Sequence, residues 1–211
     1  GATQLALLAE YGIPVARAER AASADEVLDA AQRIGYPVVL KTDEPGIAHK
    51  SDVGGVRLGL ASPEDLTAAY ADLADRLGPA VLVCQTVPAG TELALGLVRD
   101  PALGPLVVVG AGGILVELIA DRAVALPPVT AADAAGLVGE LRVARLLAGV
   151  RGAAAADLAA VTRAIAGLAE LASELGDRLE ALDINPLICG PHGAVAADAL
   201  VIPRTSEPSP G

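Results

Sequence analysis

The sequence predicts a mixed fold of helices and sheets, α/β or α+β, on the basis of two observations. Short apolar runs with strand character occupy 36–41, 56–60 and 81–87, and a segment with helix start and stop signals lies between the last two. A further strand at 92–98 follows the turn 88–90, which indicates an additional hairpin. The 211 residues suffice for one large domain or two small ones and can bury a sizeable core.

The helices of the first ninety residues are recognised by their ends. We expect them at 3–11, 23–34 and 62–77. The second has Ser23 at its N-cap with Glu26 three positions further on, and Gly35 ends it. The third starts with Ser62 as N-cap and Pro63 in the first turn, a position that tolerates proline because its amide has no helical partner.

The remaining residues predict strands, then helices, then a hairpin. We expect strands at 92–98, 106–109 and 122–126, helices at 130–141, 144–147 and 153–175, and a hairpin at 182–198. The long helix has apolar residues at helical spacing and ends at Gly176. The hairpin turns at Gly190-Pro191-His192-Gly193 between two apolar runs.

Composition and charge exclude several classes of protein. The net charge is −11 and the 15 basic residues form no run, which argues against nucleic acid as a partner. No stretch of about 18 apolar residues lacks a charge or a proline, so we expect no membrane span. The first residue is Gly rather than Met, so we expect a fragment or a trimmed form of the protein. No signal peptide pattern opens the chain, and we expect a cytoplasmic protein. Buried reduced thiols are favoured over a disulfide for Cys84 and Cys189.

Oxygen ligands gather in the predicted hairpin. Asp183 and Asn185 share one strand face because strand side chains alternate with period two, and Asp198 could fold back beside them from the second strand. Two carboxylates and an amide oxygen suit Mg²⁺ that carries a nucleotide's phosphates. The alternative is that these side chains only cap or turn a surface hairpin.

Two features of the first half suit a phosphate. Lys41 closes a buried strand, so its amine can project from the strand end towards an anion, although it could be an ordinary edge lysine. The loop at 46–56 contains Gly54 and Gly55, whose amides can approach an anion without interference from a Cβ. His49 in this loop could be a nucleophile that takes a phosphoryl group, or a surface residue.

Other candidates are weaker when taken alone. The segment from Gln85 to Glu92 could be a hinge whose backbone meets an adenine edge, with the Glu92 carboxylate on ribose hydroxyls. The run Gly110-Ala111-Gly112-Gly113 precedes strand-like residues rather than a helix, which argues against a dinucleotide fingerprint. Glu117 and Asp121 could organise a metal or phosphate or simply be solvated, and Arg151 between two glycines could clamp a phosphate.

Taken together, six ordered motifs resemble the ATP-grasp domain of NDP-forming acyl-CoA synthetases. This is the beta part of ADP-forming acetate–CoA ligase, related to the beta subunit of succinyl-CoA synthetase. The resemblance covers about 5–202. The motifs are Gly35-Tyr36-Pro37-Val38-Val39-Leu40-Lys41, His49-Lys50-Ser51-Asp52-Val53-Gly54-Gly55-Val56, Asp100-Pro101-x-x-Gly104-Pro105, Gly110-x-Gly112-Gly113-x-x-x-Glu117, Leu147-x-Gly149-x-Arg151-Gly152 and Asp183-Ile184-Asn185-Pro186-Leu187.

The resemblance implies an ATP-grasp fold of two subdomains, each with a sheet and packed helices, and a nucleotide cleft between them. The subdomains would be 1–90, a small lid-like half, and 91–205, which holds the magnesium site, followed by a disordered tail at 206–211. ATP or ADP and Mg²⁺ would be the cofactors.

The resemblance also implies roles for individual residues. On the nucleotide, Lys41 would hold the α and β phosphates, Gly54 and Gly55 would cover the phosphate tail, Gln85, Thr86 and Val87 would meet the adenine, and Glu92 the ribose. Asn185 and Asp198 match the magnesium ligands, while Glu117 and Asp183 match acids near the phosphates. His49 matches a histidine that carries phosphate between two sites. Arg151 matches a family arginine without an assigned role.

The chain departs from the family's pattern at three positions, and we expect parts of the complete enzyme to lie outside it. Leu103 and Thr86 stand where larger residues are common, and Gln85 replaces a usual glutamate, which weakens the adenine assignment. The CoA-binding and ligase portions are absent, so a separate domain or an alpha subunit would be the partner for acyl-CoA + ADP + phosphate ⇌ acid + CoA + ATP. Rival interpretations are a regulatory ATP-grasp-like domain fused to an acetyltransferase, and an ATP-dependent carboxylate–amine ligase.

Overall fold

The computed structural model describes residues 1–47, 50–113, 120–150 and 152–204. Its contacts divide the chain into two compact units. Unit 1 comprises Gly1–Thr3 and Ala16–Val87, and unit 2 comprises Gln4–Val15 and Pro88–Gly211. Residues 4–15 therefore belong with the second unit, although they precede almost all of the first in the sequence.

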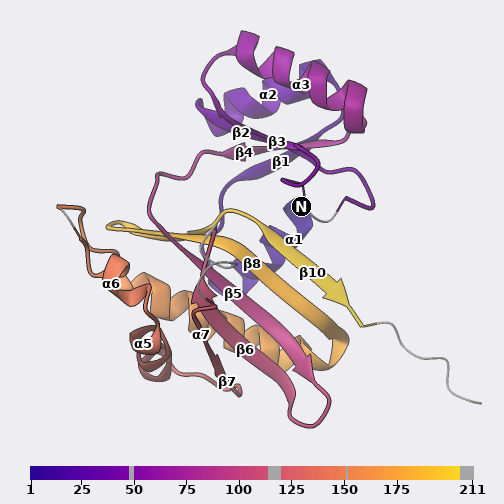
Figure 1. Cartoon of the computed structure of the whole chain (residues 1–211). Helices are drawn as coiled ribbons and strands as arrows, with labels where there is room; N and C mark the ends of the chain where they lie inside the picture. The colour runs from indigo at the N-terminus through magenta and orange to yellow at the C-terminus, as the bar shows by residue number, and fades with distance from the viewer. Residues whose placement is uncertain (48–49, 114–119, 151, 205–211) are drawn as a thin grey trace, which may run out of the picture. The chain divides into compact units, whose positions relative to one another are not determined.

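Unit 1 is an antiparallel sheet covered on one face by two helices (Figure 1). Its elements are β1 (Ala18–Ala21), α2 (Ala24–Ile34), β2 (Val38–Thr42), β3 (Val56–Leu60), α3 (Pro63–Leu77) and β4 (Val81–Gln85). The strand order is β1-β4-β2-β3. Strands β3 and β4, which α3 connects, are not neighbours in this order. The sheet is therefore assembled from segments that are distant in the chain.

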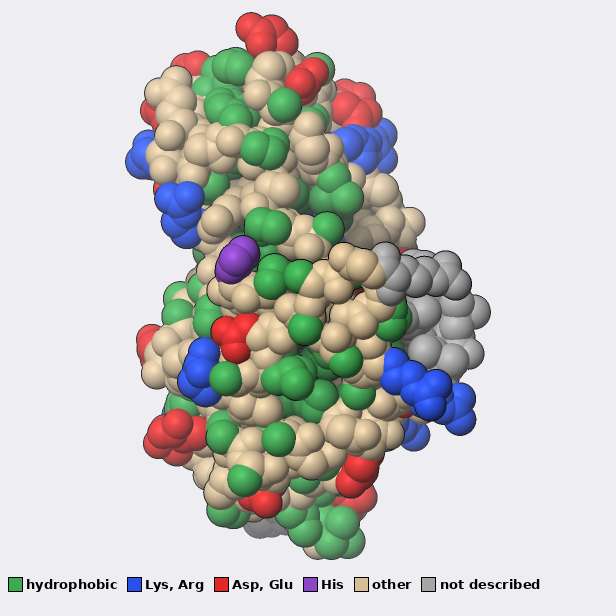
Figure 2. Space-filling model, turned by 90° about the vertical axis from the view of Figure 1, so that its left-hand side faces the viewer, with side chains coloured by type: hydrophobic (Ala, Val, Ile, Leu, Met, Phe, Trp, Pro, Cys, Tyr) green, Lys and Arg blue, Asp and Glu red, His purple; other side chains and the backbone are tan. Residues whose placement is uncertain are grey.

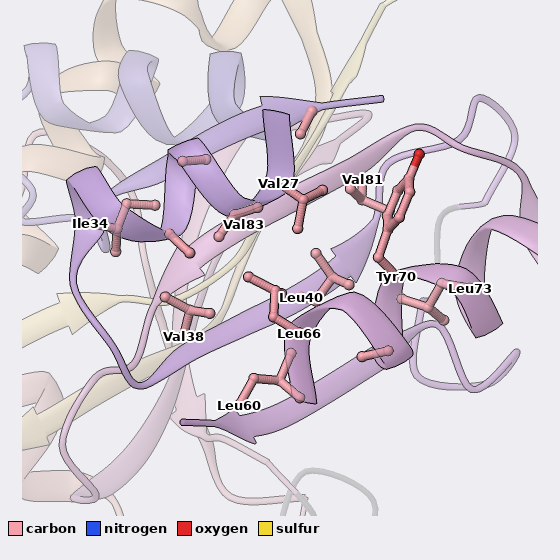
Figure 3. Close-up of a cluster of buried hydrophobic side chains, with 14 residues drawn as sticks. Val27, Ile34, Val38, Leu40, Leu60, Leu66, Tyr70, Leu73, Val81 and Val83 are labelled. Carbon is pink, nitrogen blue, oxygen red and sulfur yellow. The ribbon is translucent and has the colours of Figure 1, made fainter. Parts of the chain in front are cut away.

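The core of unit 1 lies between this sheet and its helices (Figure 3). Alternation along β2 divides its side chains between the two faces: Val38 and Leu40 join the core with α2 and α3, whereas Val39 belongs to a second cluster with Leu82 and Cys84. Leu66 and Leu73 of α3 are fully buried in the same core.

The helix ends that the sequence predicts are confirmed. The Ser23 hydroxyl accepts the amide of Glu26, and the Glu26 carboxylate accepts the amide of Ala22 at 2.8 Å. Ser62 accepts the amide of Asp65 in the same way at the start of α3. Local hydrogen bonding of serine therefore decides where both helices begin.

Unit 2 contains a larger antiparallel sheet. Its elements are α1 (Ala2–Glu10, most of which lies in this unit), β5 (Thr91–Asp100), β6 (Gly104–Ala111), β7 (Arg122–Ala125), α5 (Ala131–Glu140), α6 (Ala144–Leu147), α7 (Leu158–Leu175), the 3₁₀ turn η1 (Gly176–Arg178), β8 (Leu179–Gly190), β9 (Gly193–Ala196) and β10 (Ala199–Pro203). The strand order is β10-β8-β5-β6-β7, and β9 pairs with the second half of β8. All pairs between named strands are antiparallel, so the α+β alternative describes both units.

One face of this sheet packs against helices α7 and α5 (Figure 1). The alternate residues Leu93, Leu95 and Leu97 of β5 are fully buried on that side. The N-terminal segment joins the same unit: the amide of Ala196 donates to the carbonyl of Pro14 at 2.8 Å, beside a parallel bridge between Val15 and Ala196. The start of the chain thus extends the edge of the sheet at β9.

The start of the long helix differs from the prediction. The alanine run at 153–156 lies outside α7, which begins at Leu158 with Asp157 as its N-cap. The Asp157 carboxylate accepts the amide of Ala160 at 3.0 Å, and the amides of Ala156 and Asp157 donate to the carbonyls of Leu147 and Gly190. These long-range bonds outweigh the helix propensity of alanine.

Both cysteines are buried thiols, as expected, and burial raises the pKa of Cys189 to about 12. Within the described residues no helix has both the length and the apolar character that a membrane crossing requires. On the face shown in Figure 2, acidic and basic side chains are interspersed with apolar ones.

Candidate functional site

Asn185 and Asp198 lie across from one another on neighbouring segments of unit 2. Ala199 pairs in register with Ile184, and the amide of Ala197 donates to the carbonyl of Pro186 at 3.0 Å. The residues between these two contacts, Asn185 on β8 and Asp198 on the link from β9 to β10, therefore occupy opposite positions on the two segments. The hairpin folds back as the sequence predicted.

A β-bulge creates this juxtaposition. Leu93 pairs with Leu187 and Leu95 pairs with Ile184, so Asn185 and Pro186 of β8 together oppose the single residue Ala94 of β5. A bulge bends its strand and reorients the side chains beside it, and bulges are frequent next to functional sites. Opposite the bulge, the partner of β8 changes from β10 to β9.

The bulge also shifts the alternation of buried and exposed residues along β8. Leu182 and Ile184 are buried before it, and Leu187 and Cys189 after it. Asp183 is consequently exposed and Asn185 half-buried on the opposite face from Ile184. The shared face of Asp183 and Asn185 agrees with the period-two argument.

Glu92, at the start of β5, lies near the bulge of β8, and we call this region the corner of the sheet. Its carboxylate packs against Gly113, whose amide donates to Asn185 Oδ1 at 3.4 Å. Asp198 Oδ1 accepts the amide of Ala199 at 2.9 Å. The corner therefore gathers two carboxylates and one amide oxygen, from Glu92, Asp198 and Asn185, with Asp183 two residues further along β8.

This set of side chains suits a hard cation that keeps other ligands. Among the described residues no group of three or more His, Cys, Asp or Glu side chains is arranged to hold a metal. Mg²⁺ binds oxygen atoms in octahedral geometry and is commonly held by one or two protein carboxylates together with water and substrate phosphates. Asn185 and Asp198 fit that partial role.

Lys41 lies inside the sheet of unit 1 rather than at its end. It pairs with Val56 of β3 and Leu82 of β4, and β2 continues one residue further to Thr42. Only 8% of Lys41 is exposed. Most of the Lys41 side chain therefore packs within the sheet, unlike that of a solvated edge lysine, and its contact with the nucleotide phosphates stays a prediction.

The two glycines of the loop before β3 form a tight turn. The amides of Gly54 and Gly55 donate to the carbonyls of Ser51 and Lys50 at 3.0 and 2.7 Å. A Cβ on Gly55 would lie 2.6 Å from Thr42 Cγ2, so only glycine fits there. In this arrangement both amides are engaged within the loop, and their contact with a phosphate tail stays a prediction.

An ionic clamp holds the end of that loop. Asp72 of α3 accepts from both Arg57 of β3 and Arg76 of α3. The same two guanidinium groups donate to the carbonyl of Gly54 at 2.8 and 3.0 Å. Hydrogen bonds from Arg76, and then from Arg57, lower the pKa of the Asp72 carboxyl below its usual range.

Breaking the clamp should loosen the loop. We expect Arg76→Ala to increase hydrogen exchange at the Gly54 and Gly55 amides about fivefold at neutral pH, the scale of an exposed ion pair. Arg33→Ala, which removes the exposed Arg33–Glu19 pair of the same unit, is the control and should leave these amides unchanged. Equal exchange rates at both amides in the wild type and Arg76→Ala would show that the clamp does not order the loop.

The pKa of Asp72 sets the pH range of the clamp. A carboxylate whose pKa is lowered in the folded state stabilises it above its unfolded value of about 3.9, and this stabilisation is lost as the pH falls through the lowered pKa. The clamp should therefore persist across the neutral range and open only in strong acid.

The segment that is predicted to contact the adenine, Gln85 to Val87, begins at the last residue of β4. The amide of Gln85 donates to the carbonyl of Arg17 at 2.8 Å, and its side-chain oxygen accepts from Arg17. Thr86 and Val87 follow the strand, and within the described part of the chain the buried Thr86 hydroxyl has no hydrogen-bond partner. A buried polar atom without a partner calls for an explanation, and a ligand or a water is one.

Several predicted site residues lie elsewhere. His49, Glu117 and Arg151 are outside the described residues, so their roles stay predictions. Asp121 has a local role: its carboxylate accepts the amides of Arg142 and Val143, just before α6. The structure adds Gly113 to the candidate site, and its only signal in the sequence was the Gly-x-Gly-Gly run.

Comparisons with known proteins agree with this architecture. A family model described as ATP-grasp domain matches residues 1–202. The beta subunit of ADP-forming acetate–CoA ligase I from Pyrococcus furiosus is 35% identical over 206 residues, which cover 93% of this chain and 88% of that protein. ADP-forming acetate–CoA ligase I from Archaeoglobus fulgidus is 36% identical, and the match covers 94% of this chain but 30% of that longer protein.

Solved structures of a related synthetase have the same fold as this chain. Acetyl-coenzyme A synthetase 1 of Ca. Korarchaeum cryptofilum, in complex with coenzyme A and Ca-AMPCP, has a TM-score of 0.90 at 35% identity, covering 95% of this chain and 91% of that one. Another structure of this synthetase contains coenzyme A and Mg-AMPPCP, with a phosphohistidine segment that points towards the nucleotide binding site. Its TM-score is 0.85 at 35% identity, with coverages of 95% and 90%.

Proposed function

Because this chain belongs to the ATP-grasp domain family, we propose that it is the nucleotide-binding and phosphoryl-transfer domain of an ADP-forming acyl-CoA synthetase. The reaction is acid + CoA + ATP ⇌ acyl-CoA + ADP + phosphate. The observation that carries the proposal is the juxtaposition of Asn185 and Asp198 beside Glu92 at the β8 bulge. Relatives named as ADP-forming ligases of acetate and 4-hydroxybutyrate support the reaction class.

Phosphoryl transfer needs positioning and charge neutralisation more than covalent work by acids and bases. Asn185 and Asp198 would hold Mg²⁺, which supplies charge neutralisation across the phosphate oxygens when it is bound. Lys41 would neutralise a further part of the phosphate charge, and Glu92 would bond the ribose hydroxyls. Gln85, Thr86 and Val87 would face the adenine, where the buried Thr86 hydroxyl could find its missing partner.

His49 would be the phosphate carrier. A neutral imidazole nitrogen attacks the γ-phosphorus, an N–P bond forms, the bond to the β-phosphate oxygen breaks, and ADP leaves. The phosphoryl group then moves on to the acyl site. A covalent carrier divides one long transfer into two short ones, which is useful where the acyl-CoA and nucleotide sites are far apart. Glu117, Asp183 and Arg151 are proposed to organise the phosphates around this step.

The complete reaction requires a CoA-binding partner. The relatives from Pyrococcus furiosus are named beta subunits, and the chain spans most of their length but less than a third of the longer ligase from Archaeoglobus fulgidus. We therefore propose a CoA-binding and ligase portion, on an alpha subunit or elsewhere in a longer chain, as the partner of this domain.

A thermal-shift experiment tests the nucleotide assignment. ATP with Mg²⁺ at about 100 times its Kd should raise the Tm by about 5–10 °C, because ligand binding adds about 2.7 kcal/mol to the stability of a chain of this size. ATP with EDTA should shift the Tm less, and CoA alone should have no effect. GTP tests base preference. The proposal is wrong if neither nucleotide shifts the Tm in the presence of Mg²⁺.

A further inference from the structure

The function proposed above assigns no role to the glycine run at and just after the end of β6, although Gly113 lies within the candidate site. It comprises Gly110, Gly112 and Gly113, and each of them marks a close approach of another part of unit 2. A Cβ on Gly110 would lie 2.7 Å from the carbonyl oxygen of Asp121. Contacts this short are not seen for real Cβ atoms, so the run is required by packing rather than by flexibility alone.

The last two glycines are fitted to Glu92. The amide of Gly112 donates to the Glu92 carbonyl at 2.8 Å, and a Cβ on Gly112 would lie 2.6 Å from the carbonyl carbon of Leu93. A Cβ on Gly113 would overlap the Glu92 carboxylate. Gly113 also has φ +58°, in the left-handed region that side chains disfavour. The chain therefore folds over the start of β5 and seats the Glu92 side chain.

From this position Gly113 reaches a second strand. The sheet order places β5 between β6 and β8, so Gly113, which follows β6, crosses the start of β5 to meet β8. There its amide donates to Asn185 Oδ1 at 3.4 Å, at the bulge. One residue thus contacts both the carboxylate of Glu92 and the amide oxygen of Asn185.

We infer that Gly113 is a positioning residue that couples Glu92 to Asn185 and thereby fixes the ribose ligand and the metal ligand in one arrangement. The inference rests on the proposed function. Its physical basis is pre-organisation: two side chains that are held before binding do not have to be ordered by the nucleotide. If Gly113 is pushed away from Asn185, the Asn185 oxygen loses this amide donor, and the Mg²⁺-dependent part of nucleotide binding should weaken.

The test measures the affinity for ATP by calorimetry with Mg²⁺ and with EDTA. The ratio of the two affinities is the metal increment. We expect Gly113→Ala to reduce this increment about tenfold, because the added Cβ overlaps the Glu92 carboxylate and the resulting repulsion pushes the Gly113 amide away from Asn185 Oδ1. Gly104→Ala is the matched control. It has φ +81° at the start of β6, and nothing lies within 4 Å of an added Cβ, so it introduces backbone strain without a clash. Its metal increment should equal that of the wild type.

The same substitution made in the Glu92→Ala variant tests whether the effect of Gly113 on Asn185 depends on Glu92. In Glu92→Ala the carboxylate is absent, so adding Gly113→Ala should change the metal increment by less than about threefold. This comparison also holds if Gly113→Ala alone does not fold. A tenfold further loss in the double variant, or a Gly113→Ala protein with the increment of Gly104→Ala, overturns the inference. A wild-type protein that does not bind ATP with Mg²⁺ refutes the proposed function instead.

Discussion

Replacing His49 with alanine is expected to abolish transfer of the γ-phosphoryl group from ATP to this chain. The imidazole is proposed to form the covalent intermediate, and loss of a covalent nucleophile lowers turnover by about 10³-fold or more. Labelling with γ-³²P-ATP and Mg²⁺, on the protein assembled with its CoA-binding partner, measures the intermediate directly. Affinity for ATP with Mg²⁺ should remain close to that of the wild type, because the metal and nucleotide ligands are other residues.

The chain provides a matched control in His192, its other histidine. His192 is exposed in the turn between β8 and β9, far in the sequence from the loop at 46–56 that contains His49. His192→Ala should therefore be labelled like the wild type. Full labelling of His49→Ala would exclude the carrier role, whereas loss of nucleotide affinity in the same variant would indicate that His49 belongs to the binding site.

Replacing Asn185 and Asp198 together with alanine should weaken ATP binding in the presence of Mg²⁺ by at least about 100-fold. Loss of a residue that only supports a metal ligand already costs about 10- to 100-fold, and this variant removes both proposed protein ligands. In EDTA the variant and the wild type should bind ATP almost equally, since the loss is confined to the metal. Calorimetry under both conditions separates the two effects.

Asp177→Ala is the control for removal of an acidic side chain from unit 2. The Asp177 side chain is 87% exposed and forms an ion pair with Arg99. Its replacement lowers the negative charge without touching the corner of the sheet, so ATP binding with Mg²⁺ should be unchanged. The magnesium assignment fails if the double variant retains wild-type affinity, or if the loss is equally large in EDTA.

Local features were predictable from the sequence because local chemistry decides them. The N-caps Ser23 and Ser62 each bond an amide three residues further on, a contact that is independent of the rest of the chain. The capping box of Thr130 and Asp133 is of the same kind. The alanine run before Asp157 shows the limit: its backbone bonds go to Leu147 and Gly190, which the helix pattern could not reveal.

The candidate site was predictable only in part, because some of its contacts are local in the sequence and others depend on long-range strand pairing. Period-two alternation correctly placed Asp183 and Asn185 on one face. The bulge opposite Ala94 depends on how β8 pairs with β5, strands that lie far apart in the sequence. In retrospect, the uneven spacing of the buried residues Leu182, Ile184 and Leu187 was its signal. The contact of Gly113 with Asn185 requires the strand order of the whole sheet, which no local pattern contains.

The assignment of residues 4–15 to unit 2 means that no single cut separates this chain into its two parts. Leu5, Leu8 and Ile13 are at most 2% exposed, and Gly167 of α7 packs directly against the Tyr11 carbonyl. A piece that began at residue 88 would lack these three side chains, each worth about 1.5–3 kcal/mol of burial. That loss is comparable to the whole stability of an ordinary domain. Evolutionary exchange or truncation of the second unit therefore has to carry the first dozen residues with it.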